Sequence, residues 1–81
     1  MTITVYSTPI CPWCHRVKAY LDERKVAYTD YDVSADAAKA REMIEKTQQM
    51  GVPVVDIDGE IIIGFDKERI ESALKKHGLS S

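Results

Sequence analysis

Residues 3–21 read ITVYSTPICPWCHRVKAYL. The stretch opens on β-branched and aromatic residues, which are typical of a buried strand. Pro12 suits the first position of a helix, where its missing N–H is not needed. Apolar residues then recur three and four positions apart, as they do on the buried face of a helix: Val17, Tyr20 and Leu21. The stretch predicts a strand-to-helix junction that holds both cysteines of the chain, Cys11 and Cys14.

The rest of the chain continues the alternation of strands and helices. A second strand is expected over residues 26–33, followed by a helix with Ser34 as its N-cap. Two β-rich runs flank Asp58-Gly59, which is a strong hairpin signal. Asp66 is expected to cap a last helix, with His77 beside its final carbonyl groups. This order predicts an α/β fold, βαβαββα, with a mixed four-stranded sheet and helices on both faces.

The composition limits the kind of protein. The chain has 81 residues and a formal net charge of −2, which predicts a single domain spanning residues 1–81 and argues against nucleic acid as the main partner. No apolar run approaches the roughly 18 residues that cross a bilayer, so no membrane partner is expected. The first residues do not resemble a signal peptide, and a cytoplasmic location is expected. Residues 79–81 are expected to fray.

The two cysteines are predicted to form an exchangeable pair. At a helix N-cap, Cys11 would lie beside free backbone N–H groups and the positive end of the helix dipole, which stabilise a thiolate. The thiolate is the attacking species in disulfide exchange. Cys14, one turn further in, should be less exposed and act as the resolving thiol. Arg16 and Lys18 are expected on a solvated helix face that adds positive potential.

The cysteine motif also has two other possible uses. The attachment motif of a c-type haem, Cys-x-x-Cys-His, is matched by Cys11, Cys14 and His15. That interpretation conflicts with the β-rich order of elements, with Pro12 inside the motif and with the missing export signal. A zinc site would need four ligands, and His77 lies far from the motif without ligand spacing. No metal ligands are therefore predicted.

The whole chain resembles a glutaredoxin. The resemblance is carried by residues 5–7 leading into the Cys-Pro-Trp-Cys motif, then by Val52-Pro53, by Asp58-Gly59, and by Gly64 with Asp66. It implies a thioredoxin-like fold, a thiol–disulfide oxidoreductase that carries electrons, no tightly bound cofactor, and a monomer. It also implies a peptide bond before Pro53 that is cis and lies beside the cysteine pair.

The resemblance further implies a substrate- or glutathione-binding set. Its members are Pro12, Trp13, Val52, Pro53, Gly64, Phe65 and Asp66. In glutaredoxins the segment matching Gly64 to Asp66 holds the γ-glutamyl end of glutathione. The backbone of Val52 would pair with an extended substrate.

The chain departs from the family at the other end of that glutathione site. Thr8 stands where many members have lysine, and Met50 where many have arginine. Gly64-Phe65 is similar to redoxins that supply electrons to ribonucleotide reductase and are recharged by thioredoxin reductase. Disulfide-containing proteins, ribonucleotide reductase among them, are the expected substrates. The reductant is either glutathione as a co-substrate or a thioredoxin-reductase-type flavoenzyme. The alternative function is binding or transfer of a glutathione-ligated iron–sulfur cluster.

Overall fold

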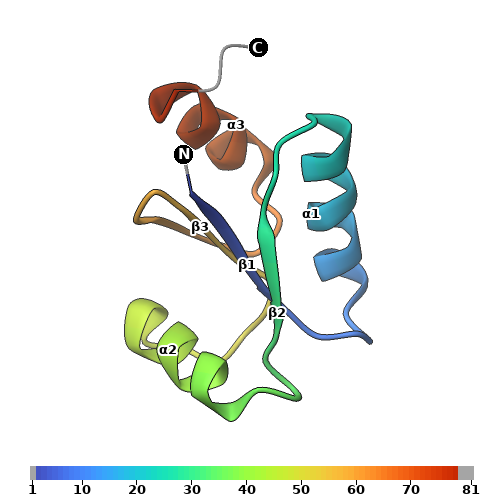
Figure 1. The fold of residues 1–81 in the computed structure, drawn as a ribbon, viewed down its shortest axis with the longest axis vertical. Helices are drawn as coiled ribbons and strands as arrows, with labels where there is room; N and C mark the ends of the chain where they lie inside the picture. The colour runs from blue at the N-terminus through green and yellow to red at the C-terminus, as the bar shows by residue number, and fades with distance from the viewer. Residues whose placement is uncertain (1, 79–81) are drawn as a thin grey trace.

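The computed structural model describes residues 2–78 (Figure 1). In chain order its elements are β1 (Ile3–Ser7), α1 (Pro12–Glu23), β2 (Thr29–Asp32), α2 (Ala37–Thr47), β3 (Val54–Ile57), β4 (Glu60–Ile63) and α3 (Lys67–Lys76). The predicted order βαβαββα is confirmed. The expectation for residues 79–81 lies outside the described residues.

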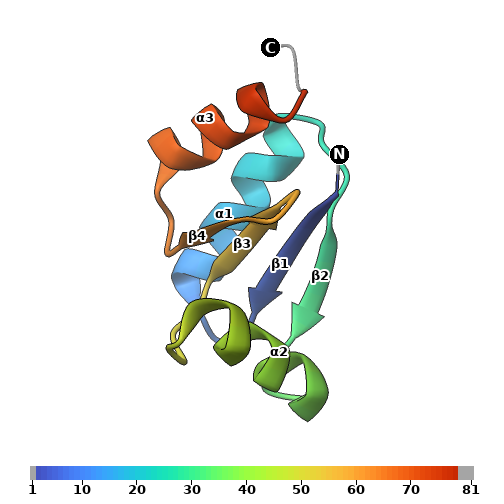
Figure 2. The ribbon, with the colours of Figure 1, turned by 90° about the vertical axis from the view of Figure 1, so that its left-hand side faces the viewer.

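The four strands form one mixed sheet in the order β2-β1-β3-β4. β1 runs parallel to β2, and β3 is antiparallel to both β1 and β4. Figure 2 shows α2 in front of this sheet and α1 behind it, so helices cover both faces, as predicted.

The core is divided by the sheet into two unequal parts. The larger cluster joins the sheet to α1 and α3, and its strand residues are Ile3, Val5, Val55, Ile57 and Ile62. The smaller cluster lies under α2 and consists of Tyr6, Met43 and Val54. Alternate residues of a strand point to opposite faces, so neighbouring positions such as Val5 and Tyr6 supply different clusters.

A polar network supplements the smaller cluster. The Tyr6 hydroxyl donates a hydrogen bond to Glu42 of α2. Lys46 Nζ donates to the Tyr6 hydroxyl at 2.8 Å and to Asp56 Oδ2 at 2.7 Å. Because these residues belong to α2, β1 and β3, the network fixes α2 to the sheet where apolar packing is sparse.

The hairpin between β3 and β4 is confirmed. Asp58 and Gly59 have positive φ angles of 49° and 94°. Such angles suit a two-residue turn whose twist matches that of the flanking strands, and they favour glycine.

Two boundaries differ from the sequence predictions. β2 spans Thr29–Asp32 rather than residues 26–33. The N-cap of α2 is Asp36, whose Oδ1 accepts from the Lys39 N–H at 3.1 Å. Ser34 instead donates its backbone N–H to Asp32 Oδ1 at 2.9 Å. The preceding carboxylate thus holds Ser34 in a local turn, and the helix starts two residues later than predicted.

His77 is the C-cap residue of α3, and its ring has a partner that the sequence did not indicate. The ring Nε2 lies 3.2 Å from Glu60 Oε1 of β4. Nearby, the Thr2 N–H donates to Asp58 Oδ1 at 2.6 Å. These contacts connect the hairpin to the start of β1 and to α3.

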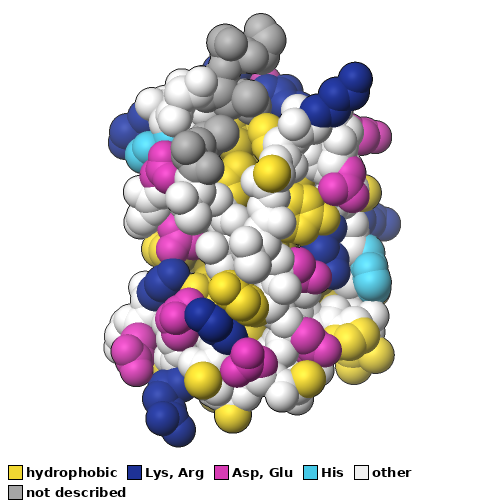
Figure 3. All heavy atoms as spheres, viewed as in Figure 1, with side chains coloured by type: hydrophobic (Ala, Val, Ile, Leu, Met, Phe, Trp, Pro, Cys, Tyr) yellow, Lys and Arg dark blue, Asp and Glu magenta, His cyan; other side chains and the backbone are white. Residues whose placement is uncertain are grey.

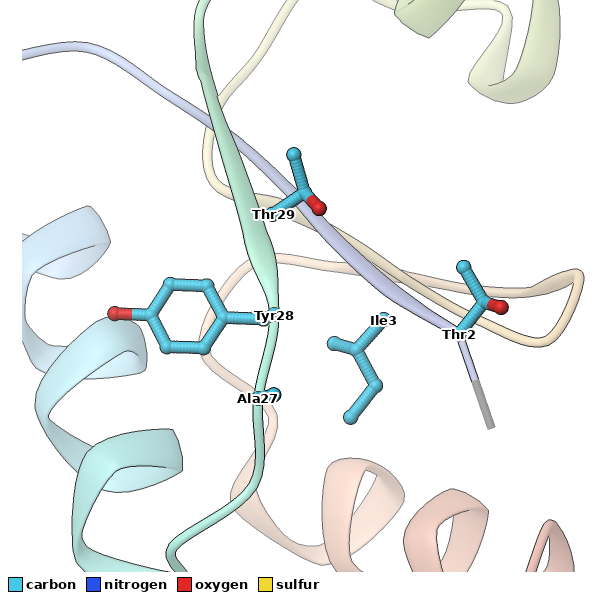
Figure 4. A pocket seen from close by; sticks show the side chains of 5 residues that line it. All are labelled: Thr2, Ile3, Ala27, Tyr28 and Thr29. Atoms are coloured by element: carbon cyan, nitrogen blue, oxygen red, sulfur yellow. The ribbon is translucent and has the colours of Figure 1, made fainter.

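A pocket of about 240 Å³ lies at this same end of β1 (Figure 4). Its lining is Thr2, Ile3, Ala27, Tyr28 and Thr29. Figure 4 shows the Tyr28 ring pointing toward α1. The pocket opens at the N-terminal end of β1, whereas the cysteines follow its C-terminal end, so it is not part of the cysteine site.

Among the helices of residues 2–78, none combines the length and the apolar character needed to cross a membrane.

Candidate functional site

The cysteine motif opens α1, as predicted. Cys11 is the N-cap, with φ −95° and ψ 110°, and Pro12 is the first helical residue. The Cys14 N–H donates to Cys11 Sγ at 3.2 Å. The Cys11 sulfur therefore faces the backbone N–H groups at the positive end of the helix dipole.

The two sulfurs differ in their surroundings. Both cysteines are free thiols; Cys11 is half-buried, whereas Cys14 is 0% exposed. Burial, together with the hydrogen bond to Cys11, raises the pKa of Cys14 to about 11. Cys11 is thus the more accessible of the two thiols, and Cys14 is the more weakly acidic one.

The strand register explains why three separate segments meet. Tyr6 of β1 pairs with Val54 of β3, which pairs with Ile63 of β4. This row is the last one that β1 shares with β3 and β4. The loop that leads to Cys11, the segment before Val54 and the segment after Ile63 therefore leave the sheet at the same end.

Val52 and Pro53 form the second of these segments. The bond between them is cis, as the resemblance implied, and Pro53 is buried while Val52 is half-buried. The Gly64 N–H donates to the Pro53 carbonyl at 2.8 Å. This hydrogen bond joins the second segment to the third.

The third segment comprises Gly64, Phe65 and Asp66. Gly64 has a φ of +80°, a conformation that favours glycine. The Phe65 ring packs 6.0 Å from that of Tyr20 in α1, between ring centroids. Asp66 is the N-cap of α3, as predicted, and its Oδ1 accepts from the Arg69 N–H at 3.2 Å. The segment is thus fixed at both of its ends.

Large apolar side chains are exposed around these segments. Within residues 2–78 the exposed large hydrophobic residues are Ile10 (90%), Trp13 (53%), Met50 (77%) and Ile63 (48%). Each belongs to, or lies next to, one of the three segments. Arg16 lies over the Trp13 ring at 4.6 Å from its centroid. Figure 3 shows apolar side chains gathered at the lower right, where α1 begins in Figure 1.

The sequence analysis did not predict a row of polar contacts that lies beside the cysteine motif. Lys18 Nζ lies 3.0 Å from Asp30 Oδ2, and the Ser7 hydroxyl donates to Asp30 Oδ1 at 2.6 Å. The Lys18 side chain is 21% exposed, and its contact with Asp30 lies in an exposed position, so Lys18 stands at the edge of the solvated face. Lys18 follows Cys14 by four positions, which places it beside the buried side of α1, but this spacing does not indicate Asp30 as its partner.

The two residues that follow the motif, His15 and Arg16, lie at the surface. His15 is exposed, and its Nε2 lies 2.8 Å from the Pro9 carbonyl oxygen. In the part of the chain that the structure describes, no group of three or more His, Cys, Asp or Glu residues is arranged to hold a metal ion.

Known proteins with similar sequences point to one family. The glutaredoxin family model matches residues 3–62. An uncharacterised glutaredoxin-like 8.6 kDa protein in the rubredoxin operon of Clostridium pasteurianum is 43% identical over 74 residues, covering 91% of this chain and 99% of that protein. Glutaredoxin 3 of Escherichia coli is 36% identical over 64 residues, covering 79% of this chain and 77% of the relative.

Solved structures agree with this family. The structure of a thioredoxin-like protein matches with a TM-score of 0.87 and 38% identity, covering 91% of this chain and 95% of the other. The glutaredoxin-like NrdH-redoxin of Escherichia coli gives 0.77 and 25%, covering 89% and 93%. A buckwheat glutaredoxin in complex with glutathione gives 0.75 and 26%, covering 93% and 74%. The predicted thioredoxin-like fold is confirmed, and the chain belongs to the glutaredoxin family as a thiol–disulfide oxidoreductase.

Proposed function

We propose that this oxidoreductase reduces disulfides in other proteins, with Cys11 as the nucleophile and Cys14 as the resolving thiol. The difference between the two sulfurs carries the proposal. Cys11 lies half-buried at the start of α1, whereas Cys14 is fully buried and its pKa is raised to about 11. A substrate disulfide would meet Cys11 first.

The reaction then proceeds by two exchanges. The Cys11 thiolate attacks one substrate sulfur, forms a mixed disulfide and releases the other substrate sulfur as a thiolate, which takes up a proton. Cys14 loses its proton, attacks Cys11 Sγ and expels the second substrate sulfur as a thiolate, which also takes up a proton. The protein ends with a Cys11–Cys14 disulfide, and the substrate has gained two electrons and two protons.

The apolar side chains around the motif favour a polypeptide as the substrate. Ile10, Trp13 and Met50 are more than half exposed, and all three lie in or next to the segments around the cysteine motif; exposed apolar residues that gather in one place mark interaction surfaces. We infer that Trp13 and Pro12 contact the substrate, that the Val52 backbone beside Pro53 pairs with its extended chain, and that residues 64–66 form the opposite wall. Ribonucleotide reductase is one candidate substrate through the resemblance to redoxins.

Trapping the mixed disulfide tests the two roles. The Cys14→Ser protein should form a covalent adduct with a disulfide-containing protein such as insulin, because nothing resolves the bond at Cys11. The Cys11→Ser protein should form none. Cys14→Ala serves as a second variant should a buried hydroxyl disturb the fold. Adducts formed by Cys11→Ser, and not by either Cys14 variant, would reverse the assignment.

We propose further that a flavoenzyme of the thioredoxin reductase type recharges the protein better than glutathione does. Positions 8 and 50 hold Thr8 and Met50, and neither carries a positive charge that could form an ion pair with the glycine carboxylate of glutathione. Loss of a hydrogen bond to a charged group costs about 1.5–3 kcal/mol, or roughly tenfold or more in affinity. The similarity to an NrdH-redoxin, which is described as having a thioredoxin-like activity profile, supports the same choice.

This second proposal has a direct assay. Oxidised protein should be reduced faster by thioredoxin reductase with NADPH than by glutathione, both followed as thiol formation. The double variant Thr8→Lys, Met50→Arg should improve reduction by glutathione roughly tenfold or more, because it restores charged contacts. Brisk cycling of the unmodified protein with glutathione, without reduction by the flavoenzyme, would contradict it.

We place the activity in the cytoplasm, since an exchangeable pair needs a reducing compartment. We also assign it to one domain of residues 1–81.

A further inference from the structure

Lys18 is a charged, partly exposed residue that borders the buried side of α1. Cys14, Val17 and Leu21 are 0% exposed, and Lys18 lies four residues after Cys14 on the same side of the helix. Residues with this spacing are neighbours, with Cβ atoms roughly 5–6 Å apart. Helical side chains also lean toward the N-terminus of their helix. The Lys18 side chain therefore leans toward the turn that holds Cys14.

The ammonium group of Lys18 is held in place from the sheet. Asp30 of β2 binds it at 3.0 Å, and the other Asp30 oxygen accepts from the Ser7 hydroxyl at 2.6 Å. Ser7 is the last residue of β1 and is 2% exposed. A partly exposed ion pair contributes only about 0–1 kcal/mol to stability. The ion pair therefore contributes little to the free energy of unfolding. Its main effect is to fix the position of the Lys18 charge.

We propose that Lys18, held by Asp30, is a positioning residue that promotes the loss of the Cys14 proton in the resolving step. The inference rests on the proposed roles of the two cysteines. In that step the Cys14 proton goes to solvent, the Cys14 thiolate attacks Cys11 Sγ, and a Cys14–Cys11 disulfide forms. The bond between Cys11 and the substrate sulfur breaks, and the substrate thiolate takes up a proton.

The electrostatics around Cys14 favour this role. Burial and the Cys11 sulfur raise the pKa of Cys14, whereas the Thr8 backbone and Lys18 lower it. These groups come from α1 and from the loop after β1, and Asp30 of β2 stands behind Lys18. In the mixed disulfide the Cys11 sulfur carries no charge and can no longer repel a second thiolate. The positive charge of Lys18 then stabilises the Cys14 thiolate, whereas burial destabilises it.

Ellman's reagent separates the two steps in a stopped-flow experiment. Attack by Cys11 releases one thionitrobenzoate, and attack by Cys14 on the mixed disulfide releases a second. The rate of the second release is measured between about pH 6 and pH 10, the range in which thiols begin to ionise. In Lys18→Met we expect a higher midpoint and a rate near neutral pH roughly threefold to tenfold lower, as expected for losing one partly screened charge. Lys18→Arg should stay close to the unmodified protein.

A matched control comes from α2. Lys39 is paired with Glu42 at 3.3 Å and is 29% exposed, so Lys39→Met removes a comparable charge away from the cysteines. It should leave the second release unchanged. Circular dichroism melts establish that each variant is folded, and Lys18→Gln replaces Lys18→Met if the latter is not.

Two results would contradict different claims. An unchanged pH midpoint in a folded Lys18→Met or Lys18→Gln protein would overturn the role of Lys18, as would an equal shift in Lys39→Met. A first release that is lost in Cys11→Ser less than in Cys14→Ser would instead overturn the roles of the cysteines.

Discussion

The two ends of the sheet are built in opposite ways. At the end where β3 turns into β4, polar groups are paired with one another. Thr2 bonds Asp58, and His77 contacts Glu60. At the other end, three segments leave the sheet together and carry the exposed apolar residues and the reachable thiol of Cys11.

The difference separates stability from chemistry. Groups that are already paired within the protein gain little from binding a partner, because a new contact must replace an existing one. Exposed apolar side chains and a half-buried thiol still have free energy to gain when a substrate covers them. We therefore expect changes at the cysteine end to alter activity, and changes at the hairpin end to alter stability alone.

The largest effect is expected from Cys11→Ser. Serine is a favoured N-cap residue, and its hydroxyl can accept the Cys14 N–H as the Cys11 sulfur does. The variant should therefore keep its thermal midpoint while disulfide reduction is lost. Insulin reduction and a thermal melt measure the two properties. Residual activity above that of a protein lacking both cysteines would show that Cys14 reacts with substrates directly.

The next effect is the selectivity between the two thiols. Iodoacetamide reacts with thiolates, and a pKa of about 11 leaves roughly one Cys14 in ten thousand ionised at pH 7. Mass spectrometry of the reduced protein after brief alkylation should find the label on Cys11. Labelling of Cys14 first would contradict the difference between the sulfurs.

The same shift has a consequence for stability in alkaline solution. The pKa of Cys14 rises from its ordinary value of 9.0 to about 11 on folding. Above pH 9 the unfolded chain therefore binds fewer protons than the folded one, and stability should fall as the pH rises through this window. Cys14→Ala should flatten this part of a urea-unfolding series against pH.

The contrast between the ends also explains which features the sequence could predict. Local signals were sufficient for the hairpin at Asp58-Gly59, for Pro12 at the start of α1 and for the cap at Asp66. Each depends on the backbone preference of one or two residues. Side-chain partners distant in the chain were missed, since neither Lys18 with Asp30 nor His77 with Glu60 is specified by local spacing.

The start of α2 and the cysteine end show the same limit. Ser34 is a good N-cap by type, but Asp32 holds it in a turn and Asp36 takes the cap. At the cysteine end, the motifs were visible one by one. That they leave the sheet together depends on the register of Tyr6 with Val54, which only the folded chain reveals.

A matched pair of glycines, one at each end of the sheet, tests the difference between the two ends, and the expected effects are of moderate size. Gly64 lies at the cysteine end with φ +80° and Gly59 in the hairpin with φ +94°. A Cβ added at either would meet no atom within 4 Å, so alanine adds backbone strain without a clash. Each substitution should cost about 1–2 kcal/mol of stability in urea unfolding. Only Gly64→Ala should also lower kcat/KM, because the Gly64 N–H bonds the Pro53 carbonyl. Equal activity in both variants would contradict the division.

The two histidines provide the smallest test, since one lies at each end. His77 Nε2 is 3.2 Å from Glu60 Oε1 in a partly buried contact, whereas His15 Nε2 is 2.8 Å from the Pro9 carbonyl in an exposed one. His77→Gln should lower the free energy of unfolding by about 0.5–1.5 kcal/mol, the usual loss for one hydrogen bond, and leave insulin reduction unchanged. His15→Gln should barely change stability, because water replaces an exposed bond. It should slow reduction modestly instead, since Pro9 belongs to the loop that positions Cys11. The reverse pattern would show that the hairpin end takes part in the reaction.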